Sequence, residues 1–572
     1  MGKWKRYLPI LLCFLCIAAA LAFGLTDFYR SERTPMHLKF RDEGNHLTLV
    51  PYYEEAEDTY FLFLPSCTAL SDLSVTDPMT GTAVPFSQRD IPLGTDFSVP
   101  RQALDVIISG KPYSIEVWPC DTLPTLFLQG APDMLTKVHE NKENKVTAQV
   151  KILDETGAVL LQDTASFSGR GNGTWATQAG GRQAKCPYNL TFSLPVSYGP
   201  FEDATHLCLF AEFSDESKLR NSLGYFVGRE VGLDYASGYT YVNVFVNGEY
   251  LGLYGMATKR EVAKHLEEDQ IQGIFECTAY FGIHTFYSGF FEQPIRQFYG
   301  DPSYSQDVVY DLEKALTGRD WASCQALMDL DSFALMYALE EFICNYDTTS
   351  SSQYFYIDPE GMVHTMLPWD FDCSLGSTGT YFEPHQDRAL MANADHFGFS
   401  WYPVLIQWED FRLRVADMVE RHFTDELLEK ISAHLLQDMD AIESSRRCDI
   451  RRWQTAEPYS VSPPSGMETL EEFYDFFTGF LLKRRDFLLD YFRNAEDYCS
   501  VNLRSSQGSW YNSFAIPKGG RPADYIDEQD FFRRLSPNDP TGKCLAAASG
   551  VPLSRLGAIT EDIDLFVTEQ EK

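Results

Sequence analysis

The sequence predicts an α+β protein, and three observations support this fold class. Short runs in which apolar and polar residues alternate recur over residues 36–120, a pattern typical of β-strands. Apolar residues follow helical spacing over residues 400–495. Between these regions, Tyr354–Asp358 and Met362–Leu367 alternate on either side of a Pro-Glu-Gly turn, which indicates a hairpin. A chain of 572 residues is expected to contain about two to four domains.

The composition indicates folded domains and excludes some partners. Hydrophobic residues make up 44% of the chain and aromatic residues 14%, enough to build large cores. The 82 acidic residues outnumber the 47 basic ones, for a formal charge of −35. This excess repels phosphate groups, so we expect no nucleic-acid partner and no docking on anionic lipid.

The N-terminus predicts export. Met1–Arg6 contains three cations, and Tyr7–Leu25 is almost wholly apolar. Residues 1–25 are therefore interpreted as a signal peptide or a signal anchor, with a possible cleavage site at Ala20–Ala22. We expect the chain from about Thr26 onward to be secreted or displayed at the cell surface, with membrane contact only through this segment.

The cysteines predict no metal framework. Of the 13 cysteines, eleven lie in the part expected to be exported, and none forms a CxxC pair. Their scatter argues against a structural zinc site. Some disulfides are possible, and most of these cysteines are expected to be small buried hydrophobic residues.

Residues 36–120 predict a β-sandwich-like accessory module. Turns of Pro, Gly, Asp and Ser separate four strand-like runs: HLKFRDEGNHLTLVPYY, TYFLFLP, ALDVIIS and YSIEVWP. The module contains no catalytic constellation. It is either a carbohydrate-facing module or a passive spacer.

A glycine-rich loop in the second predicted domain suggests contact with phosphate. Strand patterns from residue 123 onward lead into Ser168–Trp175, which carries Arg170 among its glycines. Glycines let the backbone approach a phosphate and donate N–H groups to it. Lys185 then opens a predicted strand, 185–192, and this loop-then-lysine order is the one kinases use to hold a nucleotide. Each feature also has a structural alternative. The loop can be an ordinary turn, Arg170 can form a structural ion pair, and Lys185 can lie at an exposed strand end.

A helix is predicted over Ser217–Gly232, with Gly232 as its C-cap. Two cations and an amide crowd its first turn: Lys218, Arg220 and Asn221. Cations oppose the helix dipole at this end, so something is expected to compensate them. Two explanations stay open: an anionic ligand compensates these cations, or they form ion pairs with Asp215 and Glu216. A hairpin, Tyr241–Tyr254, follows with an Asn-Gly turn and is interpreted as scaffold.

Three acids are expected to converge around the later hairpin. Asp347 ends an apolar helix pattern, and Asp370 and Asp372 lie at the hairpin exit on either side of Phe371. Residues i and i+2 of an extended strand share a face, so these two acids should share a metal or repel each other. Hard divalent cations prefer carboxylate oxygens. Kinases place a catalytic acid, an amide ligand and an Asp-Phe-Gly metal ligand in this order, here with Gln353 as the amide. Solvated turn acids are the alternative.

Together these motifs resemble the CotH family, the spore coat protein H-like atypical kinases. The resemblance covers roughly residues 123–495 and rests on motifs that occur in the family's order: Arg170–Trp175, Lys185–Tyr188, Leu219–Asn221, Val246–Tyr254 and Pro368–Asp372. It implies a diverged two-lobe protein-kinase-like domain. It also implies a secreted or surface protein that uses ATP and Mg²⁺ or Mn²⁺ to phosphorylate Ser/Thr of a protein, itself or a coat partner.

The resemblance also assigns roles. It implies that Asp347 is the catalytic aspartate, and that Asp370, Asp372 and Gln353 hold the metal. The residues implied to contact the nucleotide are Arg170, Asn172, Lys185, Arg220 and Asn221.

Three departures from the family pattern leave the activity open. Gln353 stands where an asparagine is usual, the loop Thr348–Ser352 consists of hydroxyl residues, and Thr258 replaces a common glutamate. A catalytically inactive pseudokinase acting as a surface adhesion or binding protein is therefore the main alternative. A glycan-active enzyme with paired carboxylates is a third.

The last part of the chain completes the predicted order. The helical residues up to 495 are interpreted as the C-terminal lobe of the kinase-like domain. Residues 499–572 are interrupted by Gly, Pro and Ser and are expected to be a tail or a small appended unit, with one short helix at Glu528–Leu535.

Overall fold

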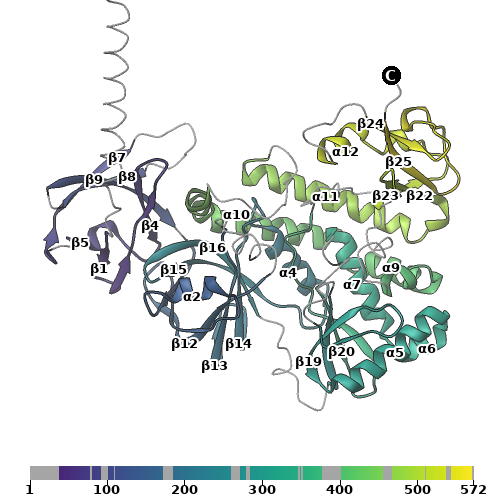
Figure 1. Cartoon of the computed structure of the whole chain (residues 1–572), viewed down its shortest axis with the longest axis horizontal. Coiled ribbons are helices and arrows are strands. Elements are labelled where there is room, and N and C mark those ends of the chain that lie inside the picture. The colour runs from purple at the N-terminus through teal and green to yellow at the C-terminus, as the bar shows by residue number, and fades with distance from the viewer. Residues whose placement is uncertain are drawn as a thin grey trace, which may run out of the picture. The chain divides into compact units, whose positions relative to one another are not determined.

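The computed structural model shows a mixed α/β protein with several sheets and helices (Figure 1). It describes residues 38–569 except for 78–79, 92–100, 109, 121, 172–174, 176–183, 259–270, 279–283, 346–347, 349–351, 376–400, 455–466, 509 and 536–542. The described residues up to Cys120, together with Asn247–Tyr250, form one compact unit. The other described residues form a second unit. The predicted signal segment lies outside the described residues.

The first unit is β-rich, as predicted. It contains a four-stranded sheet in the order β2-β1-β5-β6 and a five-stranded sheet in the order β3-β4-β9-β8-β7. The strands are β1 Phe40–Asp42, β2 Leu47–Leu49, β3 Tyr52–Glu54, β4 Thr59–Pro65, β5 Leu73–Thr76, β6 Ala83–Val84, β7 Phe86–Ile91, β8 Arg101–Ile108 and β9 Lys111–Cys120. The sandwich arrangement of the two sheets stays a prediction.

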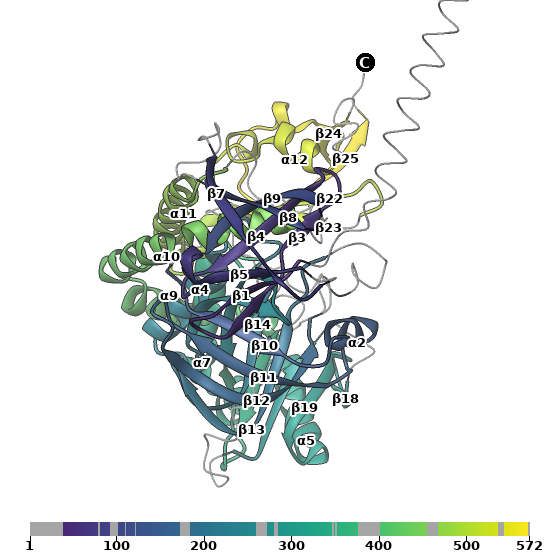
Figure 2. The same cartoon turned by 90° about the vertical axis from the view of Figure 1, so that its left-hand side faces the viewer.

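The second unit begins with a closed barrel in the order β10-β11-β12-β13-β14-β16-β15, in which β10 and β15 pair in parallel. Figure 2 shows β10, β11, β12 and β13 side by side in this order. Its strands are β10 Thr125–Gln129, β11 Val146–Leu153, β12 Val159–Gly169, β13 Tyr188–Tyr198, β14 Phe201–Phe210, β15 Tyr239–Val246 and β16 Glu249–Thr258. Apolar side chains that alternate along the strands fill one core, including Phe167, Leu190 and Val244. A short helix, α2 (Met134–Glu140), packs on β11 and β12.

Two local predictions in the barrel can be compared with the structure. The predicted hairpin Tyr241–Tyr254 is confirmed: Asn247 and Gly248 both have positive φ, 49° and 90°, as a two-residue hairpin turn requires. The strand predicted to open at Lys185 instead begins at Tyr188, which pairs with Leu209. Pro187 has no N–H to donate to a ladder, so Lys185 lies in the segment before the strand.

The predicted helix after β14 is also confirmed. It is α4 (Arg220–Glu230), and Gly232 follows it at φ 80°. The N–H of Gly232 bonds the carbonyl of Arg229, and the N–H of Leu233 bonds that of Gly228. These bonds satisfy carbonyls at the helix end, as expected of a glycine beyond a C-cap.

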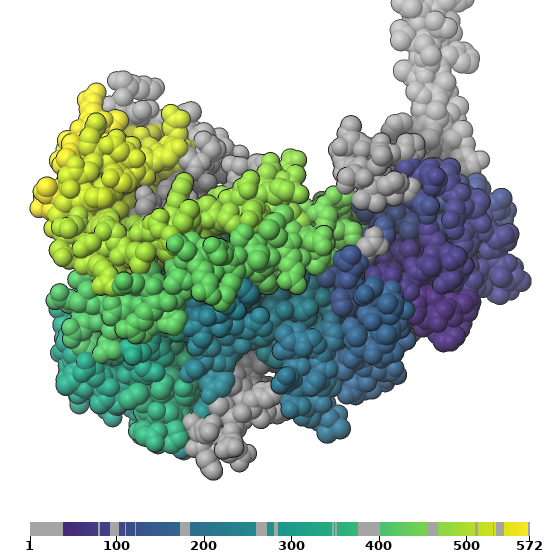
Figure 3. All heavy atoms as spheres, turned by 180° about the vertical axis from the view of Figure 1, so that it is seen from behind, coloured from purple at the N-terminus to yellow at the C-terminus, as the bar shows by residue number. Residues whose placement is uncertain are grey.

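The remainder of the second unit combines a five-stranded sheet, β18-β19-β17-β20-β21, with a group of helices. The strands are β17 Gly273–Cys277, β18 Phe286–Tyr287, β19 Pro294–Gly300, β20 Gln353–Ile357 and β21 Val363–Met366. The helices are α5 Pro302–Gly318, α6 Trp321–Leu327, α7 Leu330–Ile343, α8 Trp401–Leu405, α9 Glu409–His422, α10 Asp425–Trp453 and α11 Leu470–Tyr491. A capping box of Thr469 and Glu472 starts α11. The space-filling view shows α10 and α11 as a continuous green surface (Figure 3).

The C-terminal residues form a four-stranded sheet, β23-β22-β25-β24, with its own core. Its elements are β22 Tyr498–Arg504, β23 Trp510–Pro517, α12 Glu528–Leu535, β24 Lys543–Ala547 and β25 Ile563–Glu569. The predicted helix is therefore confirmed. No disulfide joins the eleven cysteines of the described chain, and eight of them are buried, as predicted. No helix of the described chain is long and apolar enough to cross a bilayer.

His364 joins the β20–β21 hairpin to the start of α7. Its Nδ1 lies 3.1 Å from Asp329, the N-cap of α7, and its Nε2 lies 3.0 Å from Asp358 at the hairpin turn. Neutral imidazole has one N–H, so only the imidazolium donates to both carboxylates. Burial opposes this charge, yet the hydrogen bonds from the ring to the two aspartates raise the pKa of His364.

His364→Gln is expected to destabilise the protein in a pH-dependent way. Because the folded-state pKa lies above 6.5, the stabilisation is fully present below pH 6.5 and is lost as pH rises through the folded-state value. The loss in the free energy of unfolding should be about 1–3 kcal/mol near pH 5.5 and should shrink above neutrality, as measured by urea unfolding.

His434 provides a control with the opposite sign. Burial lowers the pKa of His434, so its contribution is present above pH 6.5 and lost as pH falls. The deficit of His434→Gln should therefore grow with pH. A deficit for His364→Gln that stays constant with pH would contradict the imidazolium bridge.

Candidate functional site

The segment after β21 holds two acids around an anchored phenylalanine. Phe371 is fully buried, while Asp370 and Asp372 are partly exposed. The Phe371 ring meets the Tyr225 ring of α4 edge-on at 5.2 Å, and a Cβ on Gly224 would lie 2.2 Å from it. Only glycine at position 224 permits this approach. The anchored ring therefore fixes where the two flanking carboxylates emerge.

The backbone of this segment is strained. Leu367, Asp370 and Leu375 have positive φ values of 47°, 67° and 50°. Each costs a non-glycine residue about 1–2 kcal/mol, so the surrounding structure must hold it there. Such strain clusters at functional sites, which supports a functional role for Asp370.

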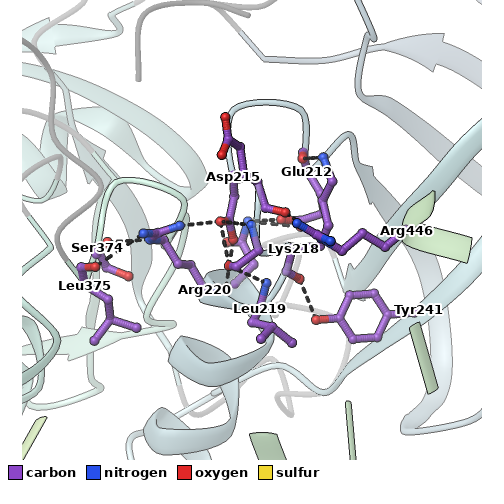
Figure 4. A network of polar contacts seen from close by, with 12 residues as sticks. Glu212, Asp215, Lys218, Leu219, Arg220, Tyr241, Ser374, Leu375 and Arg446 are labelled. Carbon is purple, nitrogen blue, oxygen red and sulfur yellow. Dashed lines mark hydrogen bonds and ion pairs between the residues drawn. The ribbon is translucent and has the colours of Figure 1, made fainter. Parts of the chain in front are cut away.

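The first turn of α4 supplies that hold (Figure 4). The guanidinium of Arg220 donates to the carbonyls of Ser374 at 2.9 Å and Leu375 at 3.4 Å. The N–H of Phe371 donates to Oδ1 of Asn221 at 2.8 Å. Arg220 and Asn221 thus bond the main chain of the acidic segment. Their predicted contact with a nucleotide is not tested by this arrangement and stays a prediction.

Asp215 orients Arg220. Its buried carboxylate pairs with the Arg220 guanidinium and accepts the Arg220 N–H at 3.0 Å. Burial opposes the charge of Asp215, but Arg220 and the hydroxyl of Ser217 lower its pKa overall. The sequence had left open an ion pair between a cation of this helix and Asp215, and the structure shows that pair for Arg220.

Glu212 orients Asn221. Its buried carboxylate accepts from Nδ2 of Asn221 at 3.0 and 3.2 Å and from the hydroxyl of Tyr239 at 2.6 Å. Burial raises the pKa of Glu212 to about 7, and the nearby charge of Asp215 acts in the same direction. The sequence offered no signal for this acid, because it lies in a loop where acids are ordinarily solvated.

Asn345 links the end of α7 to the acidic segment. Its Nδ2 donates to the carbonyl of Asp370 at 3.3 Å. Its Oδ1 is buried and has no hydrogen-bond partner among the described residues. Sequence reasoning missed this residue, although its amide lies two positions before Asp347. Asp347 itself lies outside the described residues.

Arg170 is the predicted phosphate contact that keeps an uncompensated charge. It follows β12, and its guanidinium lies 4.3 Å from the ring centre of Phe210 and 5.6 Å from that of Trp369. No carboxylate in the described part of the chain pairs with it. Trp369 precedes Asp370, so an unpaired cation lies beside the acidic segment. Asn172, in the same loop, lies outside the described residues.

Lys185 is enclosed in a buried ion pair. It is fully buried, its Nζ lies 2.6 Å from Asp449 of α10, and it donates to the carbonyl of Leu253 at 2.5 Å. Lys218 approaches the other oxygen of Asp449 at 3.3 Å. Burial lowers the pKa of Lys185 to about 8, although Asp449 opposes this shift. An acid 264 positions away in the sequence could not be paired with Lys185 from the sequence alone.

Gln353 is buried at the start of β20. Its Nε2 donates to the carbonyl of Thr348 at 3.2 Å and to the Thr348 hydroxyl, so the side chain holds the loop before the strand. Within the described ranges, no group of three His, Cys, Asp or Glu side chains could hold a metal.

The oxygen donors beside Asp370 nevertheless fit a hard cation. The carboxylates of Asp370 and Asp372 and the unpartnered amide oxygen of Asn345 are the ligand types that Mg²⁺ and Mn²⁺ prefer. In the segment 368–375, Cys373 is the single sulfur ligand and there is no histidine. The site therefore offers part of a hard-cation ligand set.

Gly252 is needed for the Lys185–Asp449 pair, and Gly252→Ala tests this. Gly252 has φ 128°, and a Cβ there would lie 2.2 Å from Oδ1 of Asp449 and 2.8 Å from Cε of Lys185. We expect a loss of roughly 3 kcal/mol in the free energy of unfolding, from overpacking and backbone strain together. Gly199→Ala is the control, because Gly199 also has positive φ but open space around it, and it should cost about 1 kcal/mol. Equal losses would contradict a collision with the pair.

A comparison with known proteins identifies the family. Residues 170–488, more than half of the chain, match the family model described as CotH kinase protein. No curated protein matches the chain. The matched range includes every site residue described above, from Arg170 of the glycine-rich loop to Asp449 of α10. The resemblance carried by the sequence motifs is thereby confirmed, and the chain belongs to the CotH kinase family.

Proposed function

We propose that this protein is an exported protein kinase that transfers the γ-phosphoryl group of ATP to Ser/Thr hydroxyls of surface or coat proteins or of itself. The observation that carries the proposal is the acidic segment: Asp370 is held at φ 67° by bonds from α4, with Asp372 on the other side of a buried Phe371. Family membership supports the reaction class. In this proposal the barrel and the helical part act as the two lobes of the kinase-like domain.

The predicted site residues supply the kinds of group that phosphoryl transfer needs, because its catalysis is mostly positioning and charge neutralisation. Asp370 and Asp372 would hold Mg²⁺ or Mn²⁺, with Gln353 or Asn345 as the amide ligand. Such an ion, when bound, neutralises charge on the phosphates. Arg170 would contact the phosphates directly, because its guanidinium is unpaired in the described chain. Lys185 would add positive potential from within its ion pair.

Asp347 would orient the acceptor hydroxyl and accept its proton. Its support is positional: in the sequence it lies two residues after Asn345, which bonds the carbonyl of Asp370. Export rests on the N-terminal apolar segment and is part of the proposal.

Asp347→Ala and Asp370→Ala should separate chemistry from binding. Loss of the general base should reduce phosphoryl transfer by about 10²–10⁴-fold and leave nucleotide binding intact. Loss of Asp370 should weaken metal-dependent nucleotide binding. The measurement is transfer of labelled phosphate by the chain from Thr26 onward, with ATP and Mg²⁺ or Mn²⁺, beside calorimetric ATP binding.

The outcomes of this experiment are distinct. Loss of both functions in both folded variants would reject the division of roles. No transfer and no metal-dependent ATP binding by the wild type would reject the kinase and favour the surface-binding pseudokinase.

Arg170→Met should raise the KM for ATP by about 10–100-fold, because a charge-assisted contact with phosphate contributes about 1.5–3 kcal/mol. Arg296→Met is a matched control: its guanidinium also stacks on a ring, 4.9 Å from the centre of Phe298, but on β19. Equal KM values for both variants and the wild type would remove Arg170 from the nucleotide site.

A further inference from the structure

We propose that Glu212 is a positioning residue: its carboxylate fixes the Asn221 amide, and Asn221 in turn holds the peptide that joins Asp370 to Phe371. The proposal rests on the proposed function only in treating Asp370 and Asp372 as metal ligands. The hydrogen bonds of the Glu212 carboxylate go to Asn221 and Tyr239, so Glu212 is expected to act on the segment through Asn221.

The carboxylate of Glu212 bonds neutral donors. Glu212 follows β14, has positive φ of 49° and is buried. Its two oxygens accept from the amide of Asn221 and the hydroxyl of Tyr239. Lys218 donates to the Glu212 main-chain carbonyl at 2.6 Å rather than to the carboxylate. The carboxylate is therefore placed to orient neutral polar groups.

These bonds allow only one orientation of the Asn221 amide. An amide has a donor end and an acceptor end, and the ionised carboxylate of Glu212 can bond only the donor end. The acceptor end then faces the N–H of Phe371, 2.8 Å away. In the reversed orientation, Oδ1 would face carboxylate oxygens and the NH₂ group would face another N–H. Both contacts would be repulsive, so the carboxylate selects the orientation that binds Phe371.

The bond to Phe371 acts on a strained point of the backbone. The N–H of Phe371 belongs to the same peptide as the carbonyl of Asp370, which accepts from Asn345. This peptide is therefore held from α4 on one side and from the end of α7 on the other. Asp370 has φ 67° immediately before it. If the Asn221 bond were lost, the peptide could rotate and relieve the strain, which would move the two carboxylates apart.

The other charged groups around Glu212 have separate tasks. Asp215 pairs with Arg220, and Lys218 approaches Asp449. Arg220 holds the far end of the segment, at Ser374 and Leu375. The segment thus has two independent attachments to α4, one controlled by each acid, and the Glu212 attachment is the one next to Asp370.

The first test is hydrogen exchange in the full chain without metal, measured on peptides that cover residues 369–375. Glu212→Gln should raise the exchange rate of this segment at least about 10-fold, because it removes one acceptor and weakens the hold on the amide orientation. Glu313→Gln is the matched control. Glu313 is also a fully buried glutamate, and it accepts from the N–H groups of Phe290 and Phe291 and the indole of Trp401. It should loosen its own surroundings and leave residues 369–375 unchanged.

Asn221→Ala provides the second comparison and covers the case in which Glu212→Gln alone folds poorly. If Glu212 acts only through Asn221, the double variant should exchange no faster in residues 369–375 than Asn221→Ala alone. Glu212→Asp, which keeps the charge and withdraws the oxygens, should give an intermediate rate. Wild-type exchange in Glu212→Gln, equal loosening by Glu313→Gln, or additive rates in the double variant would each overturn the proposal.

A Mn²⁺ titration separates this proposal from the proposed function. If Asp370 and Asp372 bind the ion, Glu212→Gln should weaken Mn²⁺ affinity about 10-fold, as is usual for residues that orient metal ligands, and Glu313→Gln should leave it unchanged. Absence of Mn²⁺ binding in the wild type would contradict the kinase assignment. The exchange rates would still decide whether Glu212 positions the segment.

Discussion

The hydrogen bonds between the first turn of α4 and the acidic segment are the interactions on which the rest of the site depends. Arg220 and Asn221 hold the main chain from Phe371 to Leu375, and Asp215 and Glu212 hold them in turn. All these polar side chains are buried. Removal of one partner from a buried pair leaves the other uncompensated, at a cost of about 3–5 kcal/mol. The network therefore keeps a strained segment in one conformation.

Close backbone approaches allow the charged groups to meet. Gly224 lets the Phe371 ring lie against α4, and Gly252 makes room for the carboxylate of Asp449 beside Lys185. A side chain at either glycine would collide with the group opposite. Both glycines lie inside regular elements, where a glycine ordinarily weakens the structure. Glycine is present at these two positions despite this loss of stability, because both positions border the site.

Much of the fold, and part of the site, could be predicted from the sequence. Periodicity identified the β15–β16 hairpin, α4, the β20–β21 hairpin and the helices α10 and α11, because each has a strong local pattern. The order of the motifs identified the family, and Asp370 and Asp372 were predicted as metal ligands from their spacing around Phe371. Glu212 and Asn345 were missed, because isolated polar residues in connecting segments give no periodic signal.

The sequence alone determined which segments become strands and helices and which turns need Asn-Gly or glycine. It also determined which acids flank Phe371. The tertiary structure alone decided which of the predicted cations are already paired. Lys185 meets Asp449 and Arg220 meets Asp215, whereas Arg170 lies against the rings of Phe210 and Trp369 with no carboxylate partner in the described chain. The reason is physical: the state of a charged group depends on burial and on neighbours within a few ångströms. For Lys185 that neighbour is brought in from a distant part of the chain by folding.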